Sequence, residues 1–248
     1  MDNFIIISGH RVGSRWIHYL LADLYDKEVS PEIDRNKLYY WRNKIRGYLD
    51  ENKIPKFHRC TVDNVLEKVL PVDYKVLAIV RNPRDRAVSY AFHHRYHDKN
   101  KGYQQRKEET DFDAIKYTIL EDVNFKNEEL QNQDNMRFGY STRNKINSEL
   151  PYIWTTYEWL VKDTEKEIKA ISNFLNAGIA DRKIRYIIHQ HSFKTKSGRE
   201  VGTEKRNDLW RRKGIIGDYM DWFDEEMMDG TKEWNDIYWE KVNAEIRG

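Results

Sequence analysis

The sequence of 248 residues contains a single cysteine, Cys60, and no long hydrophobic run. One cysteine excludes an intramolecular disulfide framework, and we interpret it as small buried filler because nothing partners it as a nucleophile. No apolar stretch approaches the roughly 20 residues of a transmembrane helix. The first eight residues also lack the charged start and long apolar core of a signal peptide. We therefore expect a cytoplasmic protein that does not enter a membrane.

An excess of charge of one sign is also missing, because 43 basic residues stand against 41 acidic ones, for a net charge of +2. This balance argues against a nucleic-acid-binding surface. The mean hydropathy of −0.90 is low, but eight Trp and sixteen Tyr can bury area while they keep a polar tip in water. The length suits one α/β domain over residues 1–248, and no repeat or linker divides it.

The most informative motif is Arg81-Asn-Pro-Arg-Asp-Arg-Ala-Val-Ser89, which follows the apolar run 74–80. That run has the composition of a buried parallel strand, and Pro83 and Asp85 suit the first turn of a following helix. Arg81 would then leave the carboxyl end of a strand, where open α/β sheets bind nucleotides. A guanidinium and a hydroxyl suit a phosphate monoester. Taken alone, a helix-capping Arg–Asp surface pair explains the motif equally well.

Residues 4–21 form a second block, in which a β-branched run precedes a loop that ends at Gly13 and an amphipathic helix from about Ser14. Strand, loop and helix N-terminus together make an anion cradle of backbone N–H groups. The glycine spacing differs from that of a Walker A loop, and no Lys-Ser/Thr pair follows. The cations of this loop are Arg11 and Arg15.

Two further segments gain meaning only beside these blocks. Lys56-Phe-His58 offers a histidine whose unperturbed pKa suits a general base, although a lone histidine is more often a surface or core residue. Residues 209–219 contain a basic triplet followed by glycine. This pattern suits a mobile loop that closes over phosphate. Taken alone, however, the segment is more simply interpreted as a solvated basic turn.

Together these blocks resemble the cytosolic-type sulfotransferases, which use 3′-phosphoadenosine 5′-phosphosulfate (PAPS). The family's loop Pro-Lys-Ser-Gly-Thr-Thr-Trp is similar to His10-Arg-Val-Gly-Ser-Arg-Trp16, and its Lys-Thr-His to the segment that ends at His58. Its 3′-phosphate block resembles Arg81 to Tyr90, and its closing Arg-Lys-Gly-x-x-Gly-Asp-Trp resembles Arg212 to Tyr219. Weaker similarities are Tyr157-Glu158 to Tyr-Glu-Asp and His191-Ser-Phe193 to Thr-Ser-Phe.

The resemblance implies a PAPS-dependent sulfotransferase with one α/β domain, in which helices flank a short parallel β-sheet of P-loop NTPase-like topology with a phosphosulfate-binding loop. It implies in-line transfer of a sulfonate to a hydroxyl or amine, which leaves adenosine 3′,5′-bisphosphate (PAP). His58 would be the general base, and Lys56 and Arg11 would stabilise the transferred group and the leaving phosphate. The implied nucleotide-binding residues are Arg11, Val12, Gly13, Ser14, Arg15, Trp16, Arg81, Ser89, Tyr157, His191, Ser192, Phe193, Arg211, Arg212, Lys213 and Gly214.

Several residues depart from the family pattern. Arg11 replaces the loop lysine and delivers its charge as a planar fork, as in the tyrosylprotein sulfotransferases, which this position resembles. Arg15 replaces a threonine, which removes a hydroxyl and adds a cation. The family's dimer segment, Lys-x3-Thr-Val-x3-Glu, has no clear counterpart around residues 196–205. We therefore expect a monomer, or a dimer through another interface.

No group of His, Cys and Asp residues has metal-ligand spacing, so we expect no metal. His93, His94 and His97 share a predicted helix, but no carboxylate or thiol stands at the right offset. His94 and His97 are instead candidates for the mouth of the acceptor site.

The expected acceptor loops are residues 25–55, 91–112 and 130–150. They are rich in charge and tyrosine and poor in aliphatic residues, which favours a small, polar acceptor over a steroid-like one. Two rival hypotheses remain: a P-loop-type nucleotide kinase or NTPase, and a catalytically silent nucleotide-binding protein of the same fold. Turnover with PAPS in the absence of magnesium would separate the three.

Periodicity completes the expected architecture. It predicts helices over 38–49, 61–70 and 164–176, a late strand over 153–157, and polar, irregular segments over 98–111 and 126–149. The inner face of the helix 164–176 would carry Ile168, Ile171, Phe174 and Leu175.

Overall fold

The structure, a computed structural model, describes residues 1–9, 11–34, 47–58, 74–97, 110–121, 144–145, 151–206, 208 and 211–247. The chain divides into two compact units. The sheet unit comprises residues 1–81, 131–191 and 248, and the helical unit comprises residues 82–130 and 192–247. That the whole chain is a single domain therefore stays a prediction.

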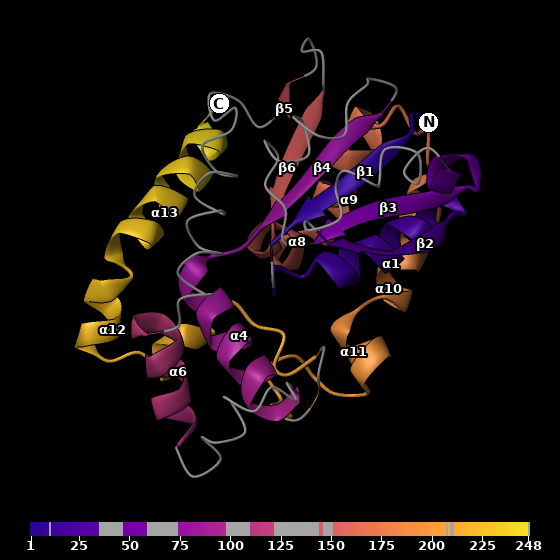
Figure 1. Ribbon diagram of the computed structural model, residues 1–248. Helices are drawn as coiled ribbons and strands as arrows, with labels where there is room; N and C mark the ends of the chain where they lie inside the picture. Colours follow the sequence, from indigo (N-terminus) through magenta and orange to yellow (C-terminus); the bar gives the residue numbers. More distant parts are fainter. Residues whose placement is uncertain are drawn as a thin grey trace. The chain divides into compact units, whose positions relative to one another are not determined.

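The sheet unit is built on a six-stranded sheet whose strands run in the order β2-β3-β1-β4-β6-β5 (Figure 1). The strands are β1 (Phe4–Ser8), β2 (Glu28–Asp34), β3 (Lys53–His58), β4 (Lys75–Val80), β5 (Asn144–Lys145) and β6 (Tyr152–Thr156). The first four and β6 pair in parallel, and β5 pairs antiparallel with β6. All five residues of β1 and of β6 are buried, as expected for a parallel sheet covered on both faces. The predicted parallel α/β fold is confirmed.

β2 was not expected, because the sequence predicted a loop over residues 25–55. Proline normally argues against a strand because it has no N–H to donate. Pro31 is tolerated here because β2 is an edge strand, which has a neighbouring strand on one side only. The register between β2 and β3 shifts between Val29 and Glu32. The loop prediction is therefore wrong over β2 and β3, and its tyrosines Tyr39 and Tyr40 lie outside the described residues.

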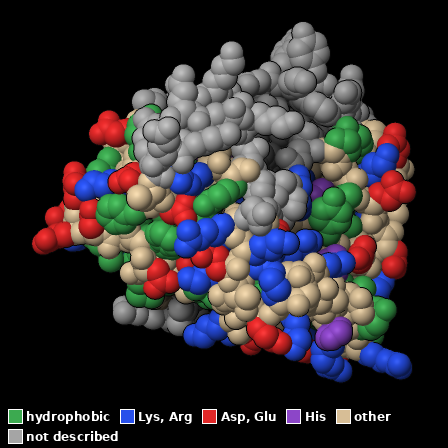
Figure 2. All heavy atoms as spheres, turned by 90° about the horizontal axis from the view of Figure 1, so that it is seen from below, with side chains coloured by type: hydrophobic (Ala, Val, Ile, Leu, Met, Phe, Trp, Pro, Cys, Tyr) green, Lys and Arg blue, Asp and Glu red, His purple; other side chains and the backbone are tan. Residues whose placement is uncertain are grey.

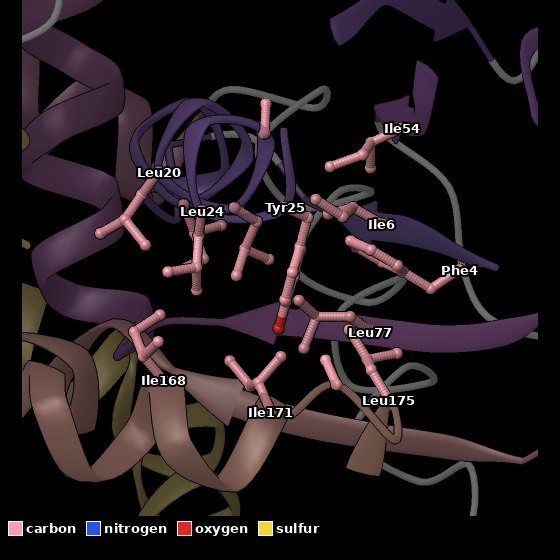
Figure 3. Packing of buried hydrophobic residues seen from close by; sticks show 14 of the residues in the cluster. Phe4, Ile6, Leu20, Leu24, Tyr25, Ile54, Leu77, Ile168, Ile171 and Leu175 are labelled. Carbon is pink, nitrogen blue, oxygen red and sulfur yellow. The ribbon is translucent and has the colours of Figure 1, made fainter. Parts of the chain in front are cut away.

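One face of the sheet is covered by α1 (Ser14–Tyr25), α9 (Thr164–Phe174) and α10 (Asp181–Gln190). Figure 3 shows Leu20 and Leu24 of α1 pointing toward Ile168 and Ile171 of α9, beside Leu77 of β4. All five side chains are fully buried. Truncating a leucine in such a core to alanine costs about 2–5 kcal/mol, so this contact fixes α1 on the sheet.

A polar bond crosses the same core. The Tyr25 hydroxyl at the end of α1 lies 3.0 Å from the Ser172 hydroxyl of α9. Burial disfavours the phenolate and raises the pKa of Tyr25 to about 12. The tyrosine therefore stays neutral and ties the two helices together.

The helical unit holds α4 (Pro83–His97), α6 (Asp111–Leu120), α11 (Phe193–Ser197), the 3₁₀ turn η2 (Asp218–Asp221), α12 (Glu225–Gly230) and α13 (Lys232–Arg247). Its core joins Val88 and Phe92 of α4, Ile115 and Ile119 of α6, and Met227 of α12. Among the described residues, no helix combines the length and apolarity that a bilayer crossing requires.

Several element predictions are confirmed. The helix over 164–176 is present as α9, two residues shorter, and its four predicted inner-face residues are buried. The late strand is present as β6, shifted by one residue because Tyr157 begins the helix α8 (Tyr157–Lys162). The predicted helix over 61–70 and most of the one over 38–49 lie outside the described residues, as do most of segments 98–111 and 126–149 and Cys60.

Two helices were missed that had readable signals. α6 begins with a capping box in which Thr110 accepts from the Asp113 N–H, and the Asp113 carboxylate accepts from the Thr110 N–H. The Thr-x-x-Asp spacing is a known helix-start pattern. α10 buries Ile184 and Ile187, at a spacing of three residues. Both the capping box and the apolar spacing lie among many charged residues, so neither was recognised as a helix signal.

Candidate active site

The carboxyl ends of four parallel strands meet at one edge of the sheet. Ser8 of β1 lies in register with His58 of β3 and with Ile79 of β4, and Val80 lies in register with Thr156 of β6. The glycine loop follows β1, Arg81 follows β4, and α8 follows β6. Four segments that the sequence singled out therefore converge where open α/β sheets bind ligands.

The glycine loop is packed tightly against the start of α8. Gly13 is the N-cap of α1 and has a φ of 83°, which only glycine adopts at low cost. A Cβ atom at this position would lie 2.7 Å from Cδ2 of Tyr157. Arg11 is also left-handed, with a φ of 60°. Because a glycine cap has no side chain, the first-turn N–H groups of α1 keep their capacity for an external anion.

Arg81 occupies the centre of this arrangement. Its guanidinium lies 4.2 Å from the centroid of the Tyr157 ring, and Nη1 donates to the Arg11 carbonyl oxygen over 3.3 Å. Its Nε is buried and finds no hydrogen-bond acceptor among the described residues. A buried donor without an acceptor is costly, and a phosphate oxygen is a natural partner for an arginine fork. These residues therefore fit an anionic, phosphorylated ligand.

β3 carries the candidate catalytic residues. The Lys56 side chain is 1% exposed, and its Cα lies in register with Ile6 of β1. β3 ends at His58, whose Cα lies beside Ser8 at the start of the glycine loop. Strand register thus places the backbone of the predicted base next to the predicted phosphosulfate loop. The side chain of His58, and the whole of His10, lie outside the described part of the chain.

An aromatic pair adjoins the loop. Trp16 of α1 meets Tyr157 edge-on, with ring centroids 6.3 Å apart and an interplanar angle of 72°. The Trp16 indole Nε1–H donates to the His191 carbonyl oxygen over 2.9 Å. The His191 imidazole in turn bonds Asp23 over 2.7 Å. Trp16 and Tyr157 thus come together as predicted neighbours, and the side chain of His191 is directed toward Asp23.

The helical unit holds the remaining predicted residues. Ser89 is half-buried on α4, and Ser192 caps α11 by accepting the Thr195 N–H. Gly214 has a φ of 72°, and a Cβ atom there would lie 2.5 Å from Cδ2 of Phe193. Phe193 therefore packs closely against the glycine that follows the basic triplet. Their binding roles, like those of Val12, Ser14, Arg15 and Arg211 at half-buried or buried positions, stay predictions.

Two side chains of the basic triplet, Arg212 and Lys213, are held by carboxylates. Arg212 forms ion pairs with Glu204 and Asp218, and the Lys213 ammonium lies 3.0 Å from Asp218 and 2.7 Å from Asp221. The Lys213 ammonium lowers the pKa of Asp221 through a hydrogen bond. Figure 2 shows the same mixture on the face it presents, where basic side chains lie next to acidic ones.

Sequence reasoning missed the residues that fix this loop. Asp85, assigned only to the helix dipole, is buried and accepts the backbone N–H groups of Gly217 over 2.8 Å and Tyr219 over 3.2 Å. Asn82 accepts the N–H groups of Arg84 and Asp85 and so caps α4. The motif that contains Arg81 therefore also anchors the segment after Gly214. Asn82 and Asp85, both side-chain acceptors in this motif, were the sequence signal that could have indicated these contacts.

His93, His94 and His97 lie on α4 as predicted. Within the described ranges, no three His, Cys, Asp or Glu side chains form a group that could hold a metal ion. The imidazole of His94 is buried and lies 4.1 Å, centroid to centroid, from the ring of Tyr90. The proposed role of His94 and His97 at an acceptor mouth is untested.

The fold and the site together define an α/β protein with a glycine loop and a helix N-terminus at the carboxyl edge of a parallel sheet. A model of the sulfotransferase domain family matches residues 1–244. The chain belongs to the sulfotransferase domain family.

Known proteins agree with this assignment. The chain is 28% identical over 176 residues to 3-beta-hydroxysteroid sulfotransferase from Cavia porcellus, which covers 68% of this chain and 56% of that protein. It is 33% identical over 101 residues to cytosolic sulfotransferase 12 from Arabidopsis thaliana, which covers 38% of this chain and 30% of that protein. The matches thus span about half or less of the curated relatives.

Solved structures show the same fold. Mouse sulfotransferase SULT7A1, solved with PAP, superposes with a TM-score of 0.65 at 20% identity and covers 94% of this chain and 83% of its own. Retinol dehydratase, solved with retinol and PAP, superposes with a TM-score of 0.55 at 18% identity and covers 93% of this chain and 79% of its own. The P-loop-like sulfotransferase fold is therefore confirmed.

Proposed function

We propose that this protein transfers a sulfonate group from PAPS to a hydroxyl or amine of a small, polar acceptor. The observation that carries this proposal is the buried Nε of Arg81, which finds no acceptor in the part of the chain that the structure describes and lies beside Tyr157 at the carboxyl edge of the sheet. Membership of the sulfotransferase family supports the reaction class. The PAP-bound relatives support the nucleotide.

In the proposed reaction, an acceptor oxygen or nitrogen attacks the sulfur of the donor in line. The bond from sulfur to the acceptor forms as the bond from sulfur to the 5′-phosphate oxygen breaks, and the acceptor proton passes to His58. Arg11 and the amides of Gly13 and Ser14 would neutralise the leaving phosphate. Lys56 would stabilise the sulfonate oxygens. Positioning and electrostatic stabilisation would then supply most of the rate enhancement.

Binding of the nucleotide is proposed to use distinct groups. In the sheet unit, Arg81 would bind the 3′-phosphate, and Trp16 and Tyr157 would border the adenine. In the helical unit, Ser89, Arg212, Lys213 and Gly214 would contribute to the 3′-phosphate and Phe193 to the adenine. No metal is required in this scheme, and the cytoplasmic location and the absence of a nucleic-acid or membrane partner stay predictions, as does a monomer or a dimer through a different interface.

The rival hypotheses are less well supported. A nucleotide kinase or NTPase would need a Walker Lys-Ser/Thr pair, whereas the segment after Gly13 reads Ser-Arg-Trp, and the family match favours sulfotransfer. A silent nucleotide-binding protein would not need a histidine at the end of β3. Both polar and steroid acceptors enter the test, because one relative is named a 3-beta-hydroxysteroid sulfotransferase whereas the expected acceptor loops of this chain are polar.

The first experiment is calorimetric titration of the purified protein with PAP, 5′-AMP and ATP. Binding of PAP at least tenfold tighter than that of the other two is expected, because only PAP carries both the 3′- and the 5′-phosphate. Equal affinities would contradict the donor assignment. Sulfonate transfer from labelled PAPS to a panel of polar and steroid acceptors, with EDTA present, then tests the reaction and the absence of a metal requirement.

A further inference from the structure

His191 is held at three points. Its backbone N–H closes α10 by bonding the Ile187 and Ile188 carbonyl oxygens at 3.0 and 3.2 Å. Its carbonyl oxygen accepts the indole N–H of Trp16, and its imidazole Nε2 donates to the Asp23 carboxylate over 2.7 Å. The imidazole is only 5% exposed. The donor, acceptor and side chain of this residue are therefore all engaged.

Two of these points lie on the same helix. Trp16 and Asp23 are both on α1 and are seven residues apart, or two turns, so they lie on the same face about 10 Å from each other. His191 bridges them from the end of α10, which runs beside α1 in Figure 1. The imidazole contact with Asp23 is a side-chain tether on His191, added to the backbone bonds that close α10. The His191 carbonyl in turn fixes the rotation of the Trp16 indole.

The consequence reaches the ligand site through aromatic contacts. The Trp16 ring meets Tyr157 edge-on, and the Tyr157 ring lies close both to Gly13 and to the guanidinium of Arg81. A shift of the Trp16 indole would therefore change the packing of the Tyr157 ring. The order of contact is therefore Asp23, His191, Trp16, Tyr157 and Arg81.

We propose that Asp23 is a positioning residue that, through His191, holds Trp16 in the orientation that binds the base of the nucleotide. The part that concerns the nucleotide rests on the proposed function. Asp23 itself is 57% exposed and touches no candidate catalytic group in the described contacts. A threonine at position 191, the residue found in the family motif that this segment resembles, has too short a side chain to span to Asp23. The linked contacts of Asp23, His191 and Trp16, called the clamp below, therefore depend on the histidine at position 191.

The matched control is Asp26, three residues further along the chain. Its carboxylate is 82% exposed and pairs with Lys183 of α10 over 2.7 Å. Asp26 is the C-cap of α1, so Asp26→Ala removes another ion pair that joins this end of α1 to α10, but one that does not involve His191. Asp23→Asn is the conservative variant, because its amide oxygen can still accept the imidazole N–H.

The first measurement is hydrogen exchange of the Trp16 indole N–H by NMR, with the resonance assigned by its loss in Trp16→Phe. We expect faster exchange in Asp23→Ala than in the wild type, little change in Asp26→Ala and near-normal exchange in Asp23→Asn. The second measurement is the dissociation constant for PAP. We expect a three- to tenfold increase in Asp23→Ala, the range for a lost hydrogen bond, with kcat for PAPS turnover nearly unchanged.

A double-mutant cycle with His191→Thr tests the route. If Asp23 acts through His191, Asp23→Ala adds nothing to the loss already caused by His191→Thr. Unchanged indole exchange and unchanged PAP affinity in Asp23→Ala would overturn the proposal, as would equal effects of Asp26→Ala. Failure of the wild type to bind PAP would instead overturn the proposed function and the nucleotide role of Trp16, whereas the indole exchange would still report on the clamp.

Discussion

The candidate phosphate-binding cations Arg81, in the sheet unit, and Arg212 and Lys213, in the helical unit, differ in the groups that hold them. Arg81 in the sheet unit stacks on Tyr157, touches a carbonyl oxygen and keeps a buried Nε without an acceptor among the described residues. Arg212 and Lys213 in the helical unit are engaged by Glu204, Asp218 and Asp221. Stacking is common to both arginines, since the Arg212 guanidinium lies 4.2 Å from the centroid of the Phe92 ring. The difference lies in the carboxylates: Arg212 and Lys213 must exchange these partners before they bind phosphate, whereas the Arg81 Nε does not.

Although both segments match family motifs, the free energy of binding a phosphate is therefore expected to differ between the Arg81 segment and the segment with Arg212 and Lys213. In the sheet unit, the ligand would satisfy a donor that the protein has already desolvated, so its binding adds a hydrogen bond without a competitor. In the helical unit, a phosphate would compete with anions of the protein itself. Asp218, only 3% exposed, is the most confined of these competitors.

The largest expected effect would separate chemistry from nucleotide binding. His58→Ala should lower kcat by about 10²- to 10⁴-fold, the usual contribution of a general base, with little change in PAP affinity. Lys213→Ala should do the reverse and weaken PAP binding more than it lowers kcat at saturating PAPS. Steady-state kinetics and calorimetry on both variants test this, and a parallel loss of activity and affinity in His58→Ala would mean that the histidine is structural.

The next effect concerns the unsatisfied donor. Arg81→Ala should weaken PAP binding by roughly ten- to a hundredfold, since a hydrogen bond to a charged group contributes about 1.5–3 kcal/mol. Arg81→Lys should recover only part of this, because an ammonium lacks the planar fork that stacks on Tyr157. The check is calorimetry with PAP and with 5′-AMP, which has no 3′-phosphate. The same loss for both nucleotides would rule out the 3′-phosphate assignment.

A smaller effect tests a feature that the two units share. Gly13 and Gly214 each have a positive φ and each lie under an aromatic ring, whereas Gly198 has a φ of +69° with nothing within 4 Å of its Cβ position. Gly198→Ala should therefore cost only the left-handed backbone penalty of about 1 kcal/mol, a drop in Tm of about 2–4 °C. Gly13→Ala and Gly214→Ala should lower Tm further. Equal shifts in thermal melts of all three would mean that the ring contacts are immaterial.

The smallest effect has the opposite sign from the others. Asp221→Asn removes one anion from Lys213 and should tighten PAP binding by about two- to threefold, in keeping with the modest strength of exposed ion pairs. The pKa of Asp221 is lowered by Lys213, so the wild type loses the same anion as the pH falls through that lowered pKa. The gain should therefore shrink in acid. Titrations at neutral and acidic pH measure it, and weaker binding in the variant would contradict competition by carboxylates.

Much of the local structure was predictable because it depends on neighbours in the sequence. The apolar run before Arg81 specified a buried strand, Pro83 specified the start of a helix, and Gly13 marked a turn that other residues disfavour. The periodic residues Ile168 and Ile171 specified the inner face of α9. Each of these signals acts over a few residues, through backbone conformation or hydrophobic period.

The tertiary structure decided what depends on distant partners. The bond from His191 to Asp23 joins residues 168 positions apart, and only the packing of α10 on α1 brings them together. Pro31 was compatible with a strand only because β2 lies at the edge of the sheet. The sequence by itself determined the family blocks and the strands β1, β4 and, within one residue, β6 beside them, whereas β3, which carries Lys56 and His58, was not predicted as a strand. Which donors stay available and which are already paired was decided by folding, because a charge is satisfied by whatever lies near it in space.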